Sequence, residues 1–544
     1  MHAPAVLLAS VGLACAWAAP LRAQAPSAKP NILFLLSDDH SYPFLGCYGD
    51  TNVKTPNLDR LALSGIRFHR FFTGAPQCVP SRATLLTGRS AVAARMTRFS
   101  SPLPPDEVTW IDLLRRDAGY FTGTAGRSHH LDGDKKSDLL QSLGLQTFGG
   151  RLDFVQPGKD ADTPGLLGAF LDRKPSDKPF AFWLNFSDPH HPWTAEDDPP
   201  DPASLKLPPH WPDLPGMRQD LAKYCGEVGR LDRTVGQVLA LLEQRGFATN
   251  TLIVFAGDNG LALPHGKGSL YDPGLNVPFF VTWPGVVKPG GESRFLVSAE
   301  DLGPTLLAAA GLPPAPKMSG KSLLPLLRGE PFTPRRFLFA ERGPHGSATV
   351  SANMSSSGYD LSRCVRSDRF KFIYNATPWI PYSPVDSAGG AAWQQIRAAH
   401  DQGQLAAPLA AAYFTAPRPV YELYDLEKDP SELTNVSGQP AYREQERELR
   451  AALTEQMIRD FDYLPLPAEL PAPGAQKLDR AQRFKALDTD RDGRLDRAEF
   501  SLNRQAADAE SWFARRDADR DGFLSRDEYI NEPAPKAPDG VSAK

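Results

Sequence analysis

Oxygen-bearing side chains follow two apolar runs that lie far apart in the sequence. Asp38 and Asp39 follow one run, and Asp258 and Asn259 follow the other. If both runs are parallel strands, their carboxyl ends meet at one edge of a sheet, where ligands commonly bind. The four side chains offer carboxylate and amide oxygens, and no cluster of cysteine or histidine accompanies them. This combination favours a hard cation such as Ca²⁺ or Mg²⁺ over zinc.

A twelve-residue acidic pattern occurs twice near the C-terminus, at residues 488–499 and 517–528. Carboxylates occupy positions one, three and five, glycine makes a sharp turn at position six, and glutamate at position twelve can supply two oxygens. This is the EF-hand calcium loop, in which position seven contributes its backbone carbonyl. The predicted ligands of two further Ca²⁺ ions are Asp488, Asp490, Asp492, Arg494 and Glu499, and Asp517, Asp519, Asp521, Phe523 and Glu528.

Apolar residues flank both acidic loops, which favours a folded module over an acidic, solvated segment. A dockerin-like module also carries duplicated calcium loops, but glutamate at position twelve and a full entering helix before each loop favour a true EF-hand pair. Calcium outside the cell is concentrated enough to fill weak sites of about 10⁻⁴–10⁻³ M. We therefore expect a stabilising or docking module rather than a calcium sensor.

The stretch CVPSRATLLTG, at residues 78–88, places a single cysteine in a proline-containing turn just ahead of a predicted helix. It resembles the signature of the type I sulfatases, C-x-P-S-R-x-x-x-L-T-G. Residues 31–39 are similar to the family's first strand with its double aspartate, and residues 189–192 are similar to its P-H-x-P segment. Residues 257–260 are similar to its second metal segment, and residues 267–272 are similar to the segment with its substrate lysine. The resemblance covers roughly residues 30–465 and leaves the EF-hand loops outside. It implies the alkaline-phosphatase superfold and sulfatase activity.

By this resemblance, Cys78 is oxidised to formylglycine by a formylglycine-generating or anaerobic maturation enzyme. The hydrated aldehyde offers two geminal hydroxyls, of which one ligates Ca²⁺ and attacks sulfur, and the other later loses its proton so that sulfate is expelled. An ordinary serine sulfate would need a second attack on sulfur, whereas a hemiacetal sulfate collapses by elimination. The resemblance thus adds Cys78 to the calcium ligands Asp38, Asp39, Asp258 and Asn259, and the cation polarises the sulfate oxygens.

The resemblance also implies roles for charged residues near this site. Arg82 stabilises the formylglycine hydroxyl, and Lys267 neutralises the sulfate oxygens as charge builds. His190 is the candidate general acid for the leaving alcohol or amine. His129 assists deprotonation of the second hydroxyl, and the adjacent His130 is an alternative for the same role.

One residue departs from the family pattern. Arg127 stands where the family usually has lysine. Arginine keeps the positive charge and can bind an oxyanion through two N–H groups, but it is not equivalent to lysine. Either Arg127 takes over the catalytic contact, or the local geometry differs and the assignment of His129 changes with it.

The elements that position these residues follow from the apolar runs. Residues 31–36, 179–186 and 251–256 read as strands buried on both faces, and helical patterns lie between them, at 55–65 and 224–245. Alternating strands and helices predict an α/β fold with a doubly wound, mainly parallel sheet sandwiched by helices. Polar residues at one strand end could simply cap a helix. Three such ends together favour a single cleft.

Beyond residue 335 the pattern changes. Residues 369–374 and 421–426 alternate like half-buried strands, which predicts a smaller α+β subdomain with an antiparallel sheet. A Pro-rich spacer follows it. We therefore divide the chain into a signal peptide, a catalytic α/β domain, a C-terminal subdomain, a linker, an α-helical EF-hand pair and a disordered tail, at residues 1–25, 26–335, 336–463, 464–476, 477–532 and 533–544.

The N-terminus carries an apolar run that is too short to span a bilayer, followed by the cleavage pattern Ala23-Gln24-Ala25. This predicts export to the periplasm or the medium, with a lipoprotein anchor at Cys15 as the alternative. No later segment is apolar and long enough for a transmembrane span. A formal net charge of −4 leaves no basic excess for binding nucleic acid. After cleavage four cysteines remain, and one pair could form a disulfide.

The sequence therefore predicts an exported, calcium-dependent sulfatase of a sulfated oligo- or polysaccharide, with O-sulfate and N-sulfate both open. A phosphate-ester hydrolase of the same superfold is the alternative if Cys78 stays a thiol. A non-catalytic calcium-binding scaffold built on the EF-hands is a third reading, but it leaves the aligned cleft residues unexplained. We expect the substrate pocket in variable loops such as residues 193–216 and 344–363.

Overall fold

The structure is a computed structural model that describes residues 29–99, 101–132, 144–194, 198–345, 359–469, 479–501 and 506–531. The predicted signal peptide, Cys15, the predicted tail and part of the predicted linker lie outside these residues. Among the helices of the described residues, none combines the length and the apolar character that a membrane span requires. The chain divides into two compact units, residues 1–467 and 468–544, which are described separately.

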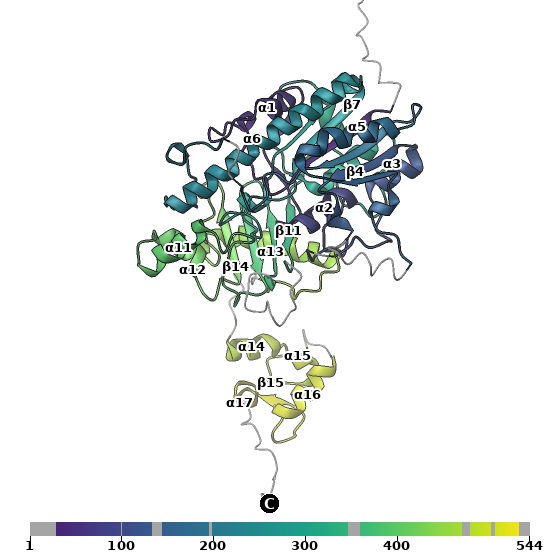
Figure 1. The fold of residues 1–544 in the computed structure, drawn as a ribbon. Coiled ribbons are helices and arrows are strands. Elements are labelled where there is room, and N and C mark those ends of the chain that lie inside the picture. The colour runs from purple at the N-terminus through teal and green to yellow at the C-terminus, as the bar shows by residue number, and fades with distance from the viewer. Residues whose placement is uncertain are drawn as a thin grey trace, which may run out of the picture. The chain divides into compact units, whose positions relative to one another are not determined.

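An eight-stranded sheet forms the centre of the first unit (Figure 1), with the strand order β5-β4-β6-β1-β7-β8-β2-β9. Its strands are β1 (Asn31–Ser37), β2 (Ile66–Phe68), β4 (Phe121–Gly126), β5 (Phe154–Pro157), β6 (Phe180–Asn185), β7 (Thr251–Gly257), β8 (Phe279–Thr282) and β9 (Gly291–Ser293). All neighbouring pairs are parallel except those that β8 makes with β7 and β2. The predicted mainly parallel sheet, with its three apolar strands, is confirmed.

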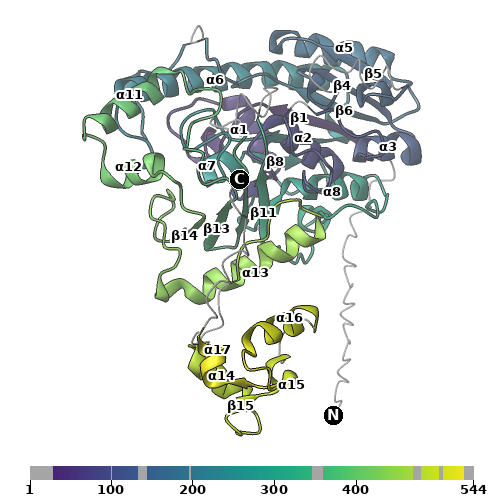
Figure 2. The ribbon, with the colours of Figure 1, turned by 90° about the horizontal axis from the view of Figure 1, so that it is seen from below.

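Helices cover both faces of this sheet (Figure 2) because its central strands are apolar on both sides. In β1, Ile32, Phe34 and Leu36 belong to one core, and the alternate residues Leu33 and Leu35 belong to the other. The first core is completed by α2 (Cys78–Thr87), α3 (Trp110–Ala118) and α8 (Leu302–Ala309), and the second by α1 (Pro56–Leu63), α5 (Thr163–Arg173) and α6 (Pro215–Gln244).

Helix α6 begins at Pro215, earlier than the predicted start at residue 224. Proline suits the first helical turn, where its missing N–H would have no intrahelical partner. Gly216 then permits a close approach, since a Cβ there would lie 2.9 Å from the carbonyl carbon of Ala391. The first turns of α6 pack against Ala391, and the helical pattern in the sequence does not reveal this contact.

A smaller antiparallel sheet follows in the same unit. Its order is β11 (Leu338–Arg342), β12 (Ser362–Arg366), β13 (Phe370–Asn375) and β14 (Tyr421–Asp425), and α13 (Arg443–Arg459) packs on one face. The other face contacts Leu270 and Leu275 of the main α/β region. This predicted antiparallel subdomain is confirmed, and its packing brings its loops close to the segment that carries Lys267. The unit also contains β3 (Phe71–Phe72), β10 (Val297–Ser298), α7 (Asp272–Leu275), α9 (Leu324–Leu327), α11 (Ala391–Asp401) and α12 (Ala407–Phe414).

The second unit is built from two helix–loop–helix repeats. Its elements are α14 (Arg480–Leu487), β15 (Arg494–Leu495), α15 (Arg497–Ser501), α16 (Ala506–Arg516), β16 (Leu524–Ser525) and α17 (Arg526–Ile530). The two loops pair antiparallel through Leu495 and Leu524, both fully buried. Phe484, Phe500 and Phe513 complete the small core. The predicted EF-hand region is therefore present as a folded pair.

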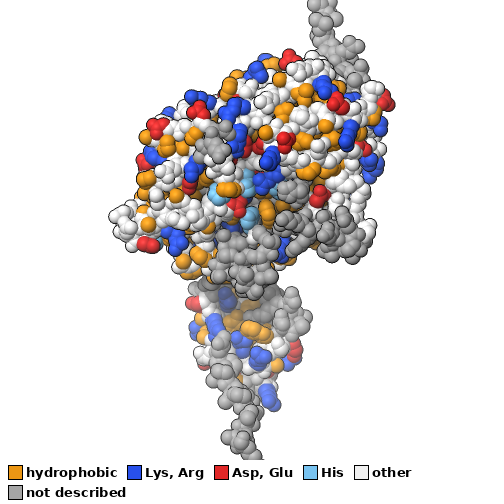
Figure 3. Space-filling view, in the orientation of Figure 1, with side chains coloured by type: hydrophobic (Ala, Val, Ile, Leu, Met, Phe, Trp, Pro, Cys, Tyr) orange, Lys and Arg blue, Asp and Glu red, His pale blue; other side chains and the backbone are white. Residues whose placement is uncertain are grey.

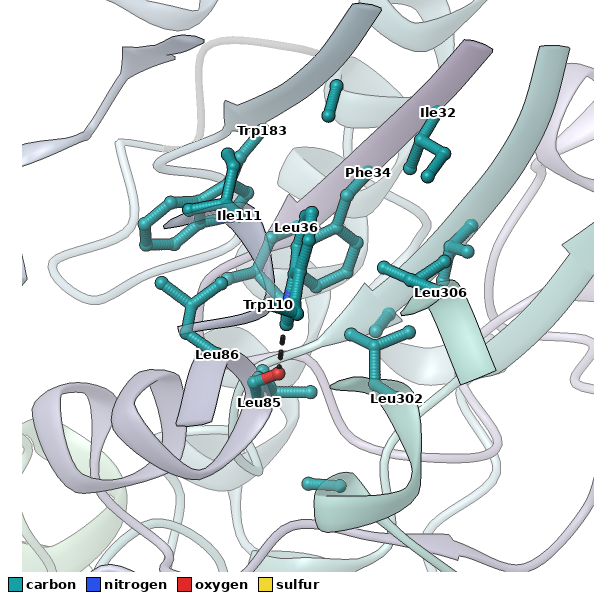
Figure 4. Close-up of a cluster of buried hydrophobic side chains, with 14 of the residues drawn as sticks. Ile32, Phe34, Leu36, Leu85, Leu86, Trp110, Ile111, Trp183, Leu302 and Leu306 are labelled. Carbon is teal, nitrogen blue, oxygen red and sulfur yellow. Dashed lines mark hydrogen bonds between the residues drawn. The ribbon is translucent and has the colours of Figure 1, made fainter. Parts of the chain in front are cut away.

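The buried aromatic cluster beneath the main sheet gives a prediction about stability (Figure 4). Phe34 stacks on Trp183 at 6.4 Å between ring centroids and forms a T-shaped pair with Trp110 at the same distance. Phe34→Ala should lower the free energy of unfolding by about 3–5 kcal/mol, because it removes these contacts and leaves a cavity. Calorimetry should show a lower melting temperature, whereas the control Leu63→Ala, at a half-exposed position, should change it little. Equal melting temperatures for both variants would contradict this packing.

Candidate active site

Cys78 is the first residue of α2, so the helix begins at the cysteine itself and not just after it. Its Sγ donates to Asp38 Oδ1 at 3.2 Å and lies 3.9 Å from Asp39 Oδ1. Burial, together with the neighbouring Asp38 charge, raises the pKa of the Cys78 thiol well above its ordinary value. A thiol held protonated in this way is a poor thiolate nucleophile.

The four predicted metal-binding side chains meet beside this cysteine, and all are fully buried. The parallel register of β1 and β7 pairs Ser37 with Gly257, so the residues after both strands are neighbours. Asp258 Oδ1 accepts hydrogen bonds from the backbone N–H groups of Asp39 (3.0 Å) and Asn259 (2.7 Å). This mutual bonding fixes the two strand ends together.

The donor set of this cluster fits a hard cation. Asn259 Nδ2 donates to Asp39 Oδ1 at 2.8 Å, while Asn259 Oδ1 is buried without a hydrogen-bond partner among the described residues. A buried amide oxygen is costly unless something compensates it. Together with three carboxylates it offers the oxygen ligands that Ca²⁺ or Mg²⁺ prefers. Asp38, Asp39, Cys78 and His190 also place ligand atoms within 4.8 Å of one another.

Arg82, one turn after Cys78 on α2, links the acidic side chains. Its guanidinium lies 3.0 Å from Asp258 Oδ2 and 3.1 Å from Asp38 Oδ2, and it donates to Asn185 Oδ1 at 2.7 Å. Burial and the charge of Asp38 raise the pKa of Asp258 to about 7, with Arg82 opposing the shift. The structure therefore places Arg82 close to Cys78, because both side chains contact Asp38.

Two further positively charged side chains balance the charge of the buried carboxylates. Arg127 Nε lies 3.1 Å from Asp38 Oδ2, and Lys267 Nζ lies 2.8 Å from Asp39 Oδ1. Burial alone would raise the pKa of Asp38, but Arg127 and Arg82 lower it well below its ordinary value. Burial alone would lower the pKa of Lys267, but the neighbouring Asp39 charge raises it well above its ordinary value. Asp38 and Lys267 are therefore held in their charged forms.

His190 stands at the open side of the cluster, where its side chain is 17% exposed. Its Nε2 lies 3.2 Å from Lys267 Nζ, 3.3 Å from Arg127 Nη2 and 3.7 Å from Asp39 Oδ2. The loop that carries it is tied down by Arg230, which binds both oxygens of Asp188 at 2.6 and 2.8 Å. His190 is thus positioned between the buried charges and the solvent.

Of the two adjacent histidines, His130 is the one whose ring the structure places at the site. It is buried, its Nε2 lies 3.9 Å from Asp38 Oδ2, and its Nδ1 lies 3.3 Å from the carbonyl of Arg127. The side chain of His129 is outside the described residues. The ring of His130 therefore lies beside Asp38, and which of the two histidines takes the proposed role stays a prediction.

Three side chains at the site were missed by the sequence reasoning. Asn185, which binds Arg82, ends β6 and could have been found as a polar residue at the end of a predicted strand. His345 lies within the loop at residues 344–363 where the sequence predicted the substrate pocket, but it was not singled out, and Asp386 belongs to no recognised motif or predicted loop. On the face of the molecule shown in Figure 3, histidine side chains gather beside basic and acidic ones.

The EF-hand loops bring most of their predicted ligands together. Asp488, Asp490 and Glu499 form one group, and Asp517, Asp519 and Asp521 form the other, each with ligand atoms within 4.8 Å. The sixth positions adopt left-handed backbone, with φ 84° at Gly493 and 86° at Gly522, as the sharp turn requires. The carboxylates of Asp492 and Glu528 lie outside these groups but within the same loops, whereas Arg494 and Phe523 could contribute only backbone carbonyls.

The four cysteines of the described residues are free thiols.

Comparison with known proteins places these observations in a family. The sulfatase family profile matches residues 30–312, and the EF hand profile matches residues 480–502 and 509–531. An ulvan-active sulfatase of Formosa agariphila is 27% identical over 470 residues, which cover 81% of this chain and 76% of that protein. The human N-sulphoglucosamine sulphohydrolase is 29% identical over 474 residues, which cover 79% and 90%.

The solved structures agree at the level of the fold. An enzyme solved in complex with its substrate D-glucosamine-2-N,6-O-disulfate superposes with a TM-score of 0.61 at 20% sequence identity, covering 81% of this chain and 100% of that chain. The family profile spans more than half of the sequence and includes the cysteine, the buried carboxylates, His190 and Lys267. The chain therefore belongs to the sulfatase family of sulfuric ester hydrolases and carries an EF-hand pair at its C-terminus.

Proposed function

We propose that this protein is an exported, calcium-dependent sulfatase that removes sulfate from a sulfated glycan through a formylglycine made from Cys78. One observation carries the proposal: Cys78 lies at the N-terminus of α2, 3.2 Å from Asp38, while Arg82 of the same helix contacts Asp38 and Asp258. The modified residue would therefore lie within the group of oxygen ligands. The signal-like N-terminus supports export.

The relatives support a glycan as the substrate. Their names refer to ulvan and to N-sulphoglucosamine, and a relative from Bacteroides thetaiotaomicron is named N-acetylglucosamine-6-O-sulfatase, so O-sulfate and N-sulfate are both represented. The O- and N-sulfate alternatives accordingly stay open for this chain. A sulfated oligo- or polysaccharide is the class we propose.

The residues of the site divide the chemistry among them. A bound divalent cation would polarise sulfate oxygens and lower the pKa of the nucleophile, and formylglycine would supply the attacking hydroxyl. Lys267 and Arg127 are placed to hold sulfate oxygens, since both reach the open side where His190 lies. His190 is placed to protonate the leaving group. His130, beside Asp38, is placed to accept a proton, and His129 stays the alternative for this role.

The phosphate-ester alternative applies if Cys78 stays a thiol. The match of residues 78–82 to C-x-P-S-R argues against it, since the proline and arginine of this signature are what the modifying enzymes read. The scaffold alternative gives no reason for burying three carboxylates with Arg82, Arg127 and Lys267 in the first unit. We assign the EF-hand loops two additional calcium ions with a stabilising or docking role.

Modification of Cys78 is the first test. After co-expression with a formylglycine-generating enzyme, mass spectrometry of the peptide containing Cys78 should show an aldehyde in place of the thiol. Cys78→Ala should abolish sulfate release while the melting temperature stays within a few degrees. Cys47→Ala, at a half-buried cysteine away from the cluster, is the matched control. An unmodified thiol, with no sulfate released from any ester or N-sulfate, would refute the proposal.

The acid role of His190 predicts a dependence on the leaving group. His190→Ala should reduce kcat by about 10²–10⁴-fold on a saccharide sulfate, whose leaving group needs a proton. The loss should be much smaller on 4-nitrophenyl sulfate, because nitrophenolate leaves without protonation. His400→Ala, at an exposed histidine, should alter neither rate. An equal loss on both substrates would assign His190 to binding instead of proton transfer.

A further inference from the structure

A carboxylate from the C-terminal subdomain reaches the rim of the catalytic site. Asp386 Oδ2 lies 2.7 Å from Lys267 Nζ and 3.9 Å from His190 Nε2, and its side chain is 28% exposed. The other carboxylate oxygen of Asp386, Oδ1, lies 3.4 Å from His345 Nε2. Asp386 therefore stands between the predicted sulfate-binding lysine and the predicted general acid, on the solvent side of both.

The backbone around Asp386 holds the carboxylate in place. Val385 is buried against Gly268, where a Cβ would lie 2.2 Å from Val385 Cγ2, and Gly268 has φ 77°, so this position requires glycine. Ser387 is also buried. His345, the partner of Asp386, packs its ring against Phe99 at 4.6 Å. The carboxylate is consequently a fixed part of the site and not a freely moving surface group.

The position of Asp386 is unfavourable for a sulfate-binding role. The carboxylate stays ionised, because His345 and Lys267 outweigh the effect of burial and lower its pKa. Lys267 already has an anionic partner in Asp39, at 2.8 Å. A sulfate group held by Lys267 would be repelled by a second carboxylate nearby. The favourable partner for Asp386 is then a hydrogen-bond donor on the part of the substrate that faces His190, which is the leaving group.

We infer that Asp386, oriented by His345, accepts a hydrogen bond from a hydroxyl or amine of the saccharide next to the sulfated position. Asp386 thus binds the leaving group and selects for sugars, whereas Lys267 binds the sulfate. A buried or half-buried acceptor discriminates strongly against ligands that lack its donor, since the acceptor is then left unpaired. This inference rests on the proposed sulfatase function.

The test compares substrates with and without such a donor. The full chain, with Cys78 converted, is assayed on N-sulfo-D-glucosamine, on D-glucosamine 6-sulfate and on 4-nitrophenyl sulfate, which carries no hydroxyl or amine. Asp386→Ala should lower kcat/KM on the preferred saccharide at least tenfold more than on 4-nitrophenyl sulfate, mainly through KM. Asp386→Asn keeps one acceptor oxygen and should lose less than Asp386→Ala. A loss on N-sulfo-D-glucosamine, whose nitrogen carries the sulfate, identifies that N–H or an adjacent hydroxyl as the donor. A loss on D-glucosamine 6-sulfate identifies a hydroxyl or the free amine of that sugar.

Control variants distinguish a wrong role for Asp386 from a misfolded variant and from a wrong proposed function. Asp401→Asn, at an exposed aspartate of the same subdomain, should leave all rates unchanged, and melting temperatures should show that the Asp386 variants are folded. Equal losses on saccharide and aryl sulfate would overturn the inference, because Asp386 would then act through Lys267. Unchanged rates, or a wild-type enzyme that hydrolyses only the aryl sulfate, would overturn it as well. A converted wild-type chain that releases sulfate from none of the three would instead refute the proposed function.

Discussion

The burial of Asp38, Asp39 and Asp258 at one edge of the central sheet is the constraint on which the rest of the structure depends. Removing a carboxylate from water costs several kcal/mol unless charges and hydrogen bonds compensate it. The parallel pairing of β1 with β7 forces these side chains together, so cations must converge on them from elsewhere. Helix α2, the segment after β4 and the segment after β7 each deliver one, as Arg82, Arg127 and Lys267.

The balance between buried carboxylates and cationic side chains also affects the chemistry of the site. Because the cations are fixed in place before any ligand arrives, they form a preorganised electrostatic site, the arrangement that stabilises developing charge most effectively. Cys78 occupies the same cluster but is a poor nucleophile as a thiol, since burial and Asp38 oppose its ionisation. The position of Cys78 among these oxygen ligands fits the proposal that the cysteine is converted into a group that carries oxygen. The C-terminal subdomain closes the rim with Asp386 and His345, which couples the smaller sheet to the choice of substrate.

The sequence predicted the parts of the fold that local pattern determines. Apolar runs marked β1, β6 and β7, and fixed spacings marked the EF-hand loops and the residues around Cys78. The same spacing could not decide between His129 and His130, because the two histidines are adjacent and the motif fixes neither of them. Asp386 was not predictable, since it reaches the site only through the packing of Val385 on Gly268, a contact between segments far apart in the chain. Likewise, the early start of α6 depends on its contact with α11 and not on its own periodicity.

We propose that the buried carboxylates of the first unit, and not the EF-hands, make sulfate hydrolysis depend on calcium. The most direct measurement is inorganic sulfate released by the Cys78-converted chain carrying Glu499→Gln and Glu528→Gln, assayed with a calcium chelator and after calcium is restored. Because these substitutions remove the EF-hand ligands at position twelve, any remaining calcium dependence belongs to the cluster around Cys78. The chelator should abolish sulfate release, and added Ca²⁺ should restore it. Sulfate release at an undiminished rate in the chelator would contradict this proposal.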